Sequence, residues 1–336
     1  MKRFVKKRKL FFVLNIIIAT LLLIVCLRQY IGVSKFFIFS FLGFFVPYLV
    51  LFNLLFLIYW FLRRKRKLLI SLIVLVFGYF VNDTFYKFGN SDIEVGGEID
   101  LISFNAHSFD GFYKYDNPNV SEDIADFIAE QNPDIVCFQE FSRIVYDRFV
   151  DYPYKYLTPD SSKSTLQAIL SKYPIIDSGS FNFENTINNA IYADIKIKKD
   201  TIRVYNVHLE SFKVRPGSLK REVPMNIFNR MNLAFQKQME QAELIKEHSL
   251  LTKHKKIICG DFNSTQFSNV YDIIKGDMKD SFLEEGIGFG NTFNFRFLPF
   301  RIDIILSDLK ITSHNNFEAQ LSDHEPVMAS FVLGDL

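Results

Sequence analysis

The sequence predicts N-terminal transmembrane α-helices followed by an α/β or α+β sandwich of mixed β-sheets. Three observations predict this fold class. The composition changes sharply near residue 90, the first 89 residues hold three long apolar runs, and the rest alternates short strand-like runs with a few helices. At 336 residues the chain is long enough for the second part to bury a core of its own.

The charges of the two parts of the chain differ in sign. Residues 1–89 carry 14 of the 39 lysines and arginines but a single acid, Asp83. The remainder holds 25 basic and 36 acidic residues, a formal net charge of −11, although the whole chain has a formal net charge of +2. The overall value is thus the sum of a basic apolar head and an acidic body.

Three apolar runs in residues 1–89 predict transmembrane helices, which we interpret as a membrane anchor. They extend over Leu10–Leu27, Phe36–Phe61 and Leu68–Phe85. A helix needs about 20 apolar residues to cross the hydrocarbon core, so the first two runs qualify and the third is marginal. No small-residue cleavage site follows the first run, which favours a spanning helix over a signal peptide.

The basic loops predict the orientation of a multi-pass protein in a bacterial-type inner (plasma) membrane. Met1–Lys9 contains six lysines and arginines and Arg63–Lys67 contains five, whereas Arg28–Lys35 contains two. Because positive loops stay in the cytoplasm, three spans would place everything after Phe85 outside it. If the third run only lay on the membrane surface, the body would face the cytoplasm instead.

The body of the chain begins after a short polar linker with glycines, residues 90–97, and continues as one domain over residues 98–336. Ser121–Gln131 and Asn229–Leu251 have helical patterns, and the first has acids in its first turn. Many strands with few helices favour a sandwich over a purely parallel sheet. The predicted strands are residues 99–104, 135–139, 168–171, 190–197, 201–208, 256–259, 302–306 and 327–332.

Polar residues recur where the predicted strands end, which is where a scaffold usually displays functional groups. Each alone has an ordinary explanation, because an acid after a strand is most often a turn or cap residue. Together they suit hydrolysis at phosphorus, which needs a hard cation, an activated water and hydrogen-bond donors for the developing charge. The residues are Asn105, Glu140, His208, Asp261, Asn263, Asp303, Asp323 and His324.

These residues belong to six short motifs that occur in a fixed order along the chain. The motifs are Asn105, Gln139-Glu140, Asn206-Val207-His208-Leu209, Gly260-Asp261-Phe262-Asn263, Arg301-Ile302-Asp303 and Ser322-Asp323-His324. In this order they resemble the endonuclease/exonuclease/phosphatase superfamily of DNase I-like proteins. The resemblance covers about residues 98–335. It implies a four-layer sandwich of two packed mixed sheets flanked by helices, with the active site at one end.

The resemblance implies Mg²⁺ or Mn²⁺ as the cofactor. Glu140 matches the principal metal ligand, Asn105 would bind metal or phosphate beside it, and Asp323 would be a second ligand or would orient water. One position departs from the pattern, because His107 stands where abasic-site endonucleases of this superfamily have an acid. Neutral imidazole suits Mg²⁺ poorly, so either His107 contacts the substrate phosphate or its role is structural.

The resemblance also implies the catalytic roles. Asp261 and His324 would together activate the attacking water, and Asp303 would fix the tautomer of the imidazole and favour its charged form. Asn263 would donate a hydrogen bond to the phosphate, and His208 would stabilise the pentacovalent transition state. Asp303 could otherwise be the salt-bridge partner of a neighbouring arginine.

The charge of the body bears on the substrate. Nucleic-acid-binding domains usually present a basic face, which a body of net charge −11 lacks in bulk. A local basic patch that includes Lys213 and Arg215 lies in the segment Glu210–Asn229, which also has apolar members and resembles a family loop that overhangs the site. We therefore expect a phosphodiesterase or phosphatase that acts on a lipid head group or a small phosphoester, with the bilayer as partner of its helices.

Two other functions compete with this expectation. The first is a membrane-anchored nuclease that cleaves DNA or RNA outside the cytoplasm. The second is a catalytically degenerate binding module of the same fold, which predicts that signature residues have been lost. None of the six motifs is lost, so the sequence favours an enzyme.

Overall fold

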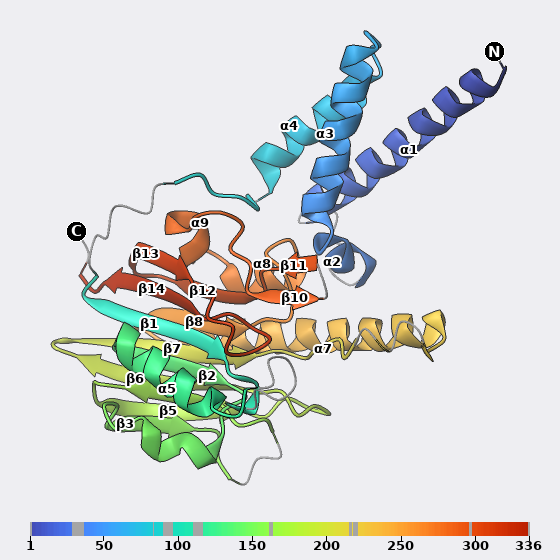
Figure 1. Ribbon diagram of the computed structural model, residues 1–336. Helices are drawn as coiled ribbons and strands as arrows, with labels where there is room; N and C mark the ends of the chain where they lie inside the picture. Colours follow the sequence, from blue (N-terminus) through green and yellow to red (C-terminus); the bar gives the residue numbers. More distant parts are fainter. Residues whose placement is uncertain are drawn as a thin grey trace. The chain divides into compact units, whose positions relative to one another are not determined.

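The computed structural model separates the chain into two compact units (Figure 1). The helical unit is made of Met1–Phe85 and Ser264–Asp272, and the sandwich unit of Tyr86–Asn263 and Ile273–Leu336. The structure describes residues 2–28, 37–82, 84–89, 97–109, 117–160, 164–214, 217, 221–295 and 298–334.

Four helices form most of the helical unit: α1 (Lys2–Cys26), α2 (Phe37–Gly43), α3 (Val46–Leu62) and α4 (Leu68–Val81). Among the described residues, one helix is long and apolar enough to cross a membrane, α1 over Arg8–Cys26. By length, α3 and α4 are shorter apolar helices.

The second apolar run, predicted as one helix over residues 36–61, is divided into α2 and α3. Pro47 lies in the first turn of α3, where its missing N–H costs nothing because that group has no partner inside a helix. In the interior of one continuous helix, the same proline would remove a hydrogen bond and clash with the preceding turn. The third run, predicted to continue to Phe85, forms a helix that ends at Val81.

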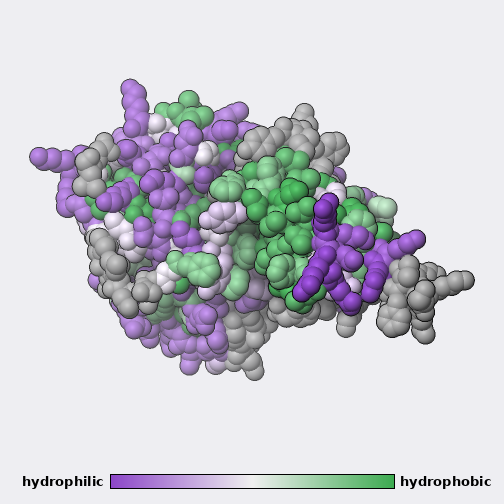
Figure 2. Space-filling view, turned by 90° about the horizontal axis from the view of Figure 1, so that it is seen from above, coloured by the Kyte–Doolittle hydropathy of each residue, from purple (hydrophilic) through white to green (hydrophobic). Residues whose placement is uncertain are grey.

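Large apolar side chains cover much of the helical surface. Figure 2 shows hydrophobic residues gathered on one face of the molecule beside a group of hydrophilic ones. Leu51, Leu55 and Ile58 on α3 and Ile73 and Val76 on α4 are all about half exposed or more. Apolar surface on this scale marks a protein or membrane contact rather than an ordinary water-facing surface.

Polar side chains inside the helical unit are paired across helices. The Asn15 side chain of α1 donates to Ser71 Oγ of α4 at 2.6 Å and accepts from Trp60 Nε1 of α3 at 3.0 Å. An unpaired amide in apolar surroundings is costly, so these two bonds favour one arrangement of the three helices over others.

The segment Ser264–Asp272 packs into the core of the helical unit. Phe267 is 3 % exposed and belongs to the same apolar cluster as Leu22 of α1. The guanidinium of Arg28, just beyond α1, is buried and donates to both carboxylate oxygens of Asp272 at 3.0 Å. Because two parallel bonds fix orientation as well as distance, this pair holds the segment against the end of α1.

Two six-stranded mixed sheets form the sandwich unit. The pairs β1–β2 and β7–β8 are parallel, and the other neighbours are antiparallel. The first sheet has the order β13 (Lys310–Asn316), β14 (Val327–Val332), β1 (Ile99–Asn105), β2 (Ile135–Gln139), β4 (Ala168–Ser171) and β3 (Tyr154–Leu157). The second has the order β5 (Ile175–Phe181), β6 (Ala190–Ile197), β7 (Asp200–His208), β8 (Lys255–Asp261), β12 (Asp303–Ser307) and β9 (Lys279–Asp280).

Helices cover the outer faces of both sheets (Figure 1). A parallel pair requires a crossover connection, and α5 (Val120–Gln131) supplies it between β1 and β2, while α7 (Pro224–Leu251) supplies it between β7 and β8. Fully buried aliphatic residues such as Leu101, Ile135 and Val204 fill the space between the sheets. Two packed mixed sheets with helices outside confirm the predicted four-layer sandwich. The shorter elements are η2 (His107–Phe109), η4 (Arg143–Arg148), α8 (Asn269–Lys275), α9 (Ser281–Glu285), β10 (Phe293–Phe295) and β11 (Leu298–Phe300).

Candidate active site

The predicted site residues of both sheets meet at one edge of the sandwich unit. Because β1 and β2 are parallel, as are β7 and β8, Asn105, His208 and Asp261 stand at the carboxyl ends of their strands. Asp303 begins the antiparallel strand β12 directly opposite Asp261. The Asn105 side chain of the first sheet donates to Asp261 of the second at 3.1 Å, so the two sets of strand ends adjoin.

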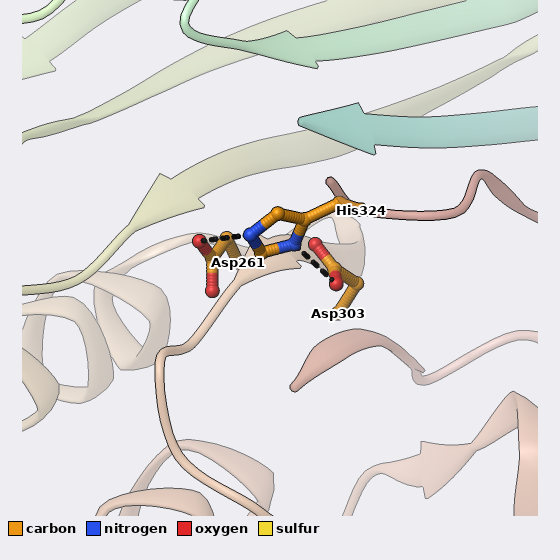
Figure 3. A group of neighbouring side chains, drawn as sticks. All are labelled: Asp261, Asp303 and His324. Atoms are coloured by element: carbon orange, nitrogen blue, oxygen red, sulfur yellow. Dashed lines mark hydrogen bonds and ion pairs between the residues drawn. The ribbon is translucent and has the colours of Figure 1, made fainter. Parts of the chain in front are cut away.

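The centre of the site is an imidazole between two carboxylates (Figure 3). His324 Nδ1 lies 2.8 Å from Asp303 Oδ2, and His324 Nε2 lies 3.7 Å from Asp261 Oδ2. All three side chains are buried. Such a geometry fixes the plane of the ring and holds one ring nitrogen toward the position of Asp261.

Burial and mutual charge shift the pKa values of this group. Burial opposes the charged imidazolium of His324, but the charges of Asp303 and Asp261 outweigh it and raise its pKa to about 10. Burial raises the pKa of Asp261 to about 7. At neutral pH the imidazolium is therefore charged, while Asp261 gains and loses a proton readily. A general base works best when its pKa lies near the working pH.

Asp261, Asp303 and His324 offer three possible metal-binding atoms within 4.8 Å of one another. Their arrangement does not suit one shared ion, however, because the imidazole lies between the two carboxylates and each ring nitrogen faces one of them (Figure 3). We therefore interpret this group as one that holds and moves a proton.

The backbone around Asp261 explains the motif Gly260-Asp261-Phe262-Asn263. Gly260 has a φ of +135°, and a Cβ atom there would lie 2.0 Å from the carbonyl oxygen of Val207, so no other residue fits. Asp261 then accepts from the backbone N–H of Asn263 at 2.8 Å, which forms a tight turn. The Asn263 side chain donates to the Leu209 carbonyl at 3.0 Å and to Asp261 Oδ2 at 3.2 Å.

Carboxylates and an amide gather beside this group at a position that fits a divalent cation. Glu140 follows β2, and Asp323 precedes His324 in the chain. Their side chains are 27 % and 36 % exposed, and both lie close to His107 Nδ1, at 3.9 Å and 3.4 Å. The Asn105 amide oxygen accepts from the backbone N–H of His107 at 3.2 Å. Partly solvated oxygen donors of this kind are the ligands that Mg²⁺ and Mn²⁺ prefer, so the residues present fit the implied metal.

His107 reaches these carboxylates from an unusual backbone turn. His107, Ser108 and Phe109 have φ values of 44°, 57° and 61°, and the left-handed region costs roughly 1–2 kcal/mol for each such residue. Two contacts offset the cost: Phe109 is buried against aromatic rings such as that of Phe138, and Ser108 N–H donates to the Glu140 carbonyl at 2.8 Å. Backbone strain of this kind is concentrated at functional sites.

His208 is a neutral imidazole at the same edge. Its Nε2 lies 3.6 Å from Asp261 Oδ2 and 3.9 Å from Glu140 Oε1. Burial, together with the charge of His324, lowers its pKa to about 3. A neutral ring offers one N–H donor without adding a positive charge to the cluster.

Of the two basic residues predicted to bind substrate, the structure describes Lys213 alone. Lys213 Nζ pairs with Glu210 Oε1 at 2.9 Å, and half of the Lys213 side chain is exposed. Arg215 lies outside the described residues. The structure therefore brings together the eight predicted catalytic and metal-binding residues and His107, but not Lys213.

Several supporting side chains were given no role from the sequence. Thr292 Oγ1 accepts from the backbone N–H of Asp303 at 3.1 Å, and the Phe293 ring lies 4.8 Å from the imidazole of His324. Ser322 Oγ donates to the Asn105 carbonyl at 2.8 Å. Each of them acts through contacts between distant parts of the chain. In the sequence, these three residues could be noticed only because they lie in or near recognisable motifs. That position does not indicate which side chains they contact.

Residues 102–324 match the model of a family described as the Endonuclease/Exonuclease/phosphatase family. Residues 8–85 match a family described as a domain of unknown function. No curated protein matches the sequence.

Solved structures resemble the sandwich unit. An endonuclease/exonuclease/phosphatase from Bacteroides vulgatus is 20 % identical with a TM-score of 0.55, and covers 70 % of this chain and 99 % of its own. TDP2 from D. rerio, complexed with a single-strand DNA product, is 15 % identical with a TM-score of 0.53, over 69 % and 97 %. The corresponding protein from Beutenbergia cavernae is 13 % identical with a TM-score of 0.53, over 70 % and 72 %. At these identities the likeness establishes the fold.

Proposed function

Because the chain belongs to the endonuclease/exonuclease/phosphatase family, we propose that it is a membrane-anchored phosphodiesterase or phosphatase that acts on a phospholipid head group or a small phosphoester. The protein is a metal-dependent hydrolase of phosphoester bonds with a DNase I-like fold. The observation that carries the proposal is the buried Asp261–His324–Asp303 group next to the oxygen ligands Glu140 and Asp323.

We assign the metal-binding role to Glu140, Asn105 and Asp323. When bound, Mg²⁺ or Mn²⁺ would polarise a phosphoryl oxygen and offset the negative charge that develops in the transition state. The burial of Glu140 is a further reason to expect a bound cation. Burial raises the pKa of Glu140, which means that its negative charge is poorly stabilised without a cation.

We assign the activation of water to Asp261. Its pKa of about 7 lets the carboxylate accept a proton from water as the water oxygen bonds to phosphorus. His324 is already protonated, since its pKa is about 10, so it acts as a donor to the phosphoryl oxygens rather than as the base. Asp303 holds that imidazolium through the 2.8 Å contact at Nδ1.

The remaining polar residues would bind the phosphate. His208 offers a neutral N–H, and the Asn263 amide offers a second donor on the turn that follows Asp261. In a buried site such donors stabilise the developing charge without having to reorient. In-line attack would then expel the alcohol of the ester on the side opposite the water.

The membrane part of the proposal rests on the apolar helices and the basic loops. The 19-residue apolar stretch of α1, the exposed apolar surfaces of α3 and α4 and the basic cluster Arg63–Lys67 support an anchor. With three spans, the catalytic domain would lie outside the cytoplasm. Its acidic charge and its attachment to the bilayer favour a lipid or a small phosphoester over a long nucleic acid.

A membrane-anchored nuclease is the second candidate. One observation favours it: a solved structure of similar fold, TDP2 from D. rerio, is complexed with single-strand DNA product. The formal net charge of −11 beyond residue 89 weighs against it, because binding to nucleic acid depends on neutralising several phosphates.

A substrate panel on the full chain in lipid nanodiscs would test the proposal. Each reaction contains Mg²⁺ or Mn²⁺ and one substrate: phospholipid or sphingomyelin vesicles, bis-p-nitrophenyl phosphate, plasmid DNA or a single-stranded oligonucleotide. The Asp261→Asn variant is the control for contaminating activity. We expect hydrolysis of the lipid or the small diester. Rapid DNA cleavage without turnover of either would instead establish the nuclease.

A further inference from the structure

The first turns of α7 leave the core of the sandwich unit. Seven of the buried residues of this helix lie between Ala234 and Ser249, whereas Ile227 is the single buried residue between Pro224 and Leu233. The helix also begins earlier than residue 229, where the sequence predicted its start. We call Val223–Leu233 the α7 arm. At about 1.5 Å per residue the arm is roughly 15 Å long, and Figure 1 shows this end of α7 projecting beyond the strands.

The Leu233 end of the α7 arm lies nearest to Asn263, in the turn that follows Asp261. Gln238, one turn along from the arm, donates from Nε2 to the backbone carbonyls of Glu210 at 2.6 Å and Asn263 at 3.3 Å. Counting 1.5 Å per residue from Gln238, Leu233 lies about 8 Å and Met225 about 20 Å along the helix. A phosphoester held by the arm would therefore lie within reach of the active site.

The exposed side chains of the α7 arm are uncharged, and the large ones are apolar. Val223, Met225 and Leu233 are 61 %, 62 % and 59 % exposed, and Phe228 is 46 % exposed. The other exposed residues of the arm are Pro224, Asn226 and Asn229. From Pro224 to Met239 the sequence contains no acid and two basic residues, although the body as a whole is acidic. The strength with which a helix binds the interface of a lipid bilayer grows with the apolar area that it can bury there, and the arm carries no acid that anionic head groups would repel.

The contacts of the basic residues distinguish a bilayer from a nucleic acid. Arg230 pairs with Glu222 at 2.6 Å, and Lys237 donates to the Asn185 carbonyl. Strands of nucleic acid are usually held by free cations and by stacked aromatic rings, and here the exposed side chains are mainly aliphatic. The chemistry of the arm therefore fits acyl chains and the glycerol region better than phosphates and bases.

We propose that the α7 arm inserts into the surface of a phospholipid bilayer and presents the head group of a membrane phospholipid to the Asp261 site. This inference rests on the proposed phosphoesterase function, and it specifies the substrate class as a lipid within a bilayer. It also gives the acidic catalytic domain a contact with the membrane that its own charge would not provide.

Measuring how deeply the arm enters the bilayer, on the full chain, tests the proposed contact without relying on enzyme turnover. A nitroxide is attached at Met225→Cys, and the matched control carries it at Leu244→Cys, which lies on the same helix and is 49 % exposed. The native cysteines are all buried, and the unsubstituted protein gives the background labelling. In liposomes we expect a several-fold higher ratio of oxygen to nickel-chelate accessibility at position 225 than at 244. Equal ratios would overturn the proposal.

A second measurement distinguishes the role of the arm in membrane contact from the chemical step at the active site. Met225→Asp and Leu233→Asp should each slow the hydrolysis of phospholipid in vesicles several-fold while leaving bis-p-nitrophenyl phosphate turnover unchanged, and Leu244→Asp should change neither. Lipid turnover unaffected by both arm substitutions would overturn the proposal.

If the enzyme hydrolyses the small diester but no lipid, the lipid substrate is wrong, while the nitroxide data still decide whether the arm meets the bilayer. A nitroxide signal at position 225 that responds to an oligonucleotide or to protein concentration, and not to lipid, would assign the arm to nucleic acid or to a second copy of the chain.

Discussion

Asp303→Asn is the substitution whose effect follows most directly from the geometry of the site. Asp303 is 1 % exposed, and its Oδ2 lies 2.8 Å from His324 Nδ1. At an effective dielectric constant of about 20, a charge pair at about 4 Å is worth roughly 4 kcal/mol. That energy corresponds to about 3 pKa units. Without the charge of Asp303, the pKa of His324 should fall from about 10 to near neutrality.

The expected consequence is a change in the pH dependence of kcat as well as in its size. At pH 8 only about a tenth of the variant would carry the imidazolium if its pKa fell to about 7. The uncharged amide would also fail to hold the productive tautomer, and comparable substitutions in a Ser-His-Asp triad lower kcat by about 10⁴-fold. We therefore expect a loss of at least about 100-fold at pH 8, and a falling limb near pH 7 that the wild type does not show.

The assay is hydrolysis of bis-p-nitrophenyl phosphate by the full chain from pH 5.5 to 9.5. Asp308→Asn is a matched control, because Asp308 directly follows β12 and pairs with Lys256 at 3.0 Å outside the catalytic cluster. The reasoning would be refuted if Asp303→Asn kept the wild-type kcat and pH profile. The same refutation would follow if Asp308→Asn behaved identically.

Four other predictions concern metal binding, stability and folding. Glu140→Gln should weaken Mn²⁺ binding by at least about 10- to 100-fold in titration calorimetry, because loss of a residue that only supports a metal ligand already costs that much. Unchanged affinity would remove Glu140 from the ligands. Arg28→Gln should destabilise the helical unit by about 1.5–3 kcal/mol in denaturant titrations, because it removes the charged donor to both oxygens of Asp272, whose side chain is 26 % exposed. No measurable change would show the pair to be dispensable. Gly260→Ala should lower both folding yield and activity, since the added Cβ would meet the Val207 carbonyl oxygen at 2.0 Å, and a fully active variant would contradict the close approach. The pKa of His324 in the folded protein, about 10, lies above its usual 6.5. Its contribution to stability is therefore complete below pH 6.5 and is lost as the pH rises through about 10. The Tm of the metal-free protein should fall across that pH range, and a flat or rising Tm would contradict this assignment.

The sequence predicted the interior strands of the sandwich and missed its edges. The eight predicted strands correspond to β1, β2, β4, β6, β7, β8, β12 and β14, which are the interior strands of the two sheets. In these two sheets, the four strands that were not predicted, β3, β5, β9 and β13, are the four edge strands; the short strands β10 and β11, which pair with each other, were also not predicted. Interior strands are buried on both faces and so have apolar runs. Edge strands are shorter, polar or half-exposed, as in Lys310–Asn316 and Ile175–Phe181, and lack that pattern.

The helical unit shows the limits of apolar runs as a guide to helices. Composition indicated where the apolar segments lie, but the division of the second run depends on Pro47 and on the short helix α2 before it. The packing of Ser264–Asp272 among the helices had no sequence signal at all. Phe267 resembles any apolar residue after a motif, and its partners are more than 180 positions away in the chain.

The sequence predicted a group of site residues that the structure brings together, because they follow strands in recognisable motifs, but it could not predict their electrostatics. Asp261 and Asp303 look alike in sequence, and both are buried. Only the structure shows that His324 lies between them. The left-handed turn at His107 was also not predictable, because no glycine marks it and the cost is offset by distant contacts of Phe109.

The central claim is that Asp261 activates water at a phosphoester bound beside the metal ligands, and one variant tests it directly. The measurement is kcat of the full-length Asp261→Asn protein on bis-p-nitrophenyl phosphate, together with its Mn²⁺ affinity. Asparagine has the shape of aspartate but cannot accept the proton, so we expect a loss of roughly 10²–10⁴-fold in kcat with Mn²⁺ binding retained. A variant that binds Mn²⁺ and turns over at the wild-type rate would contradict it.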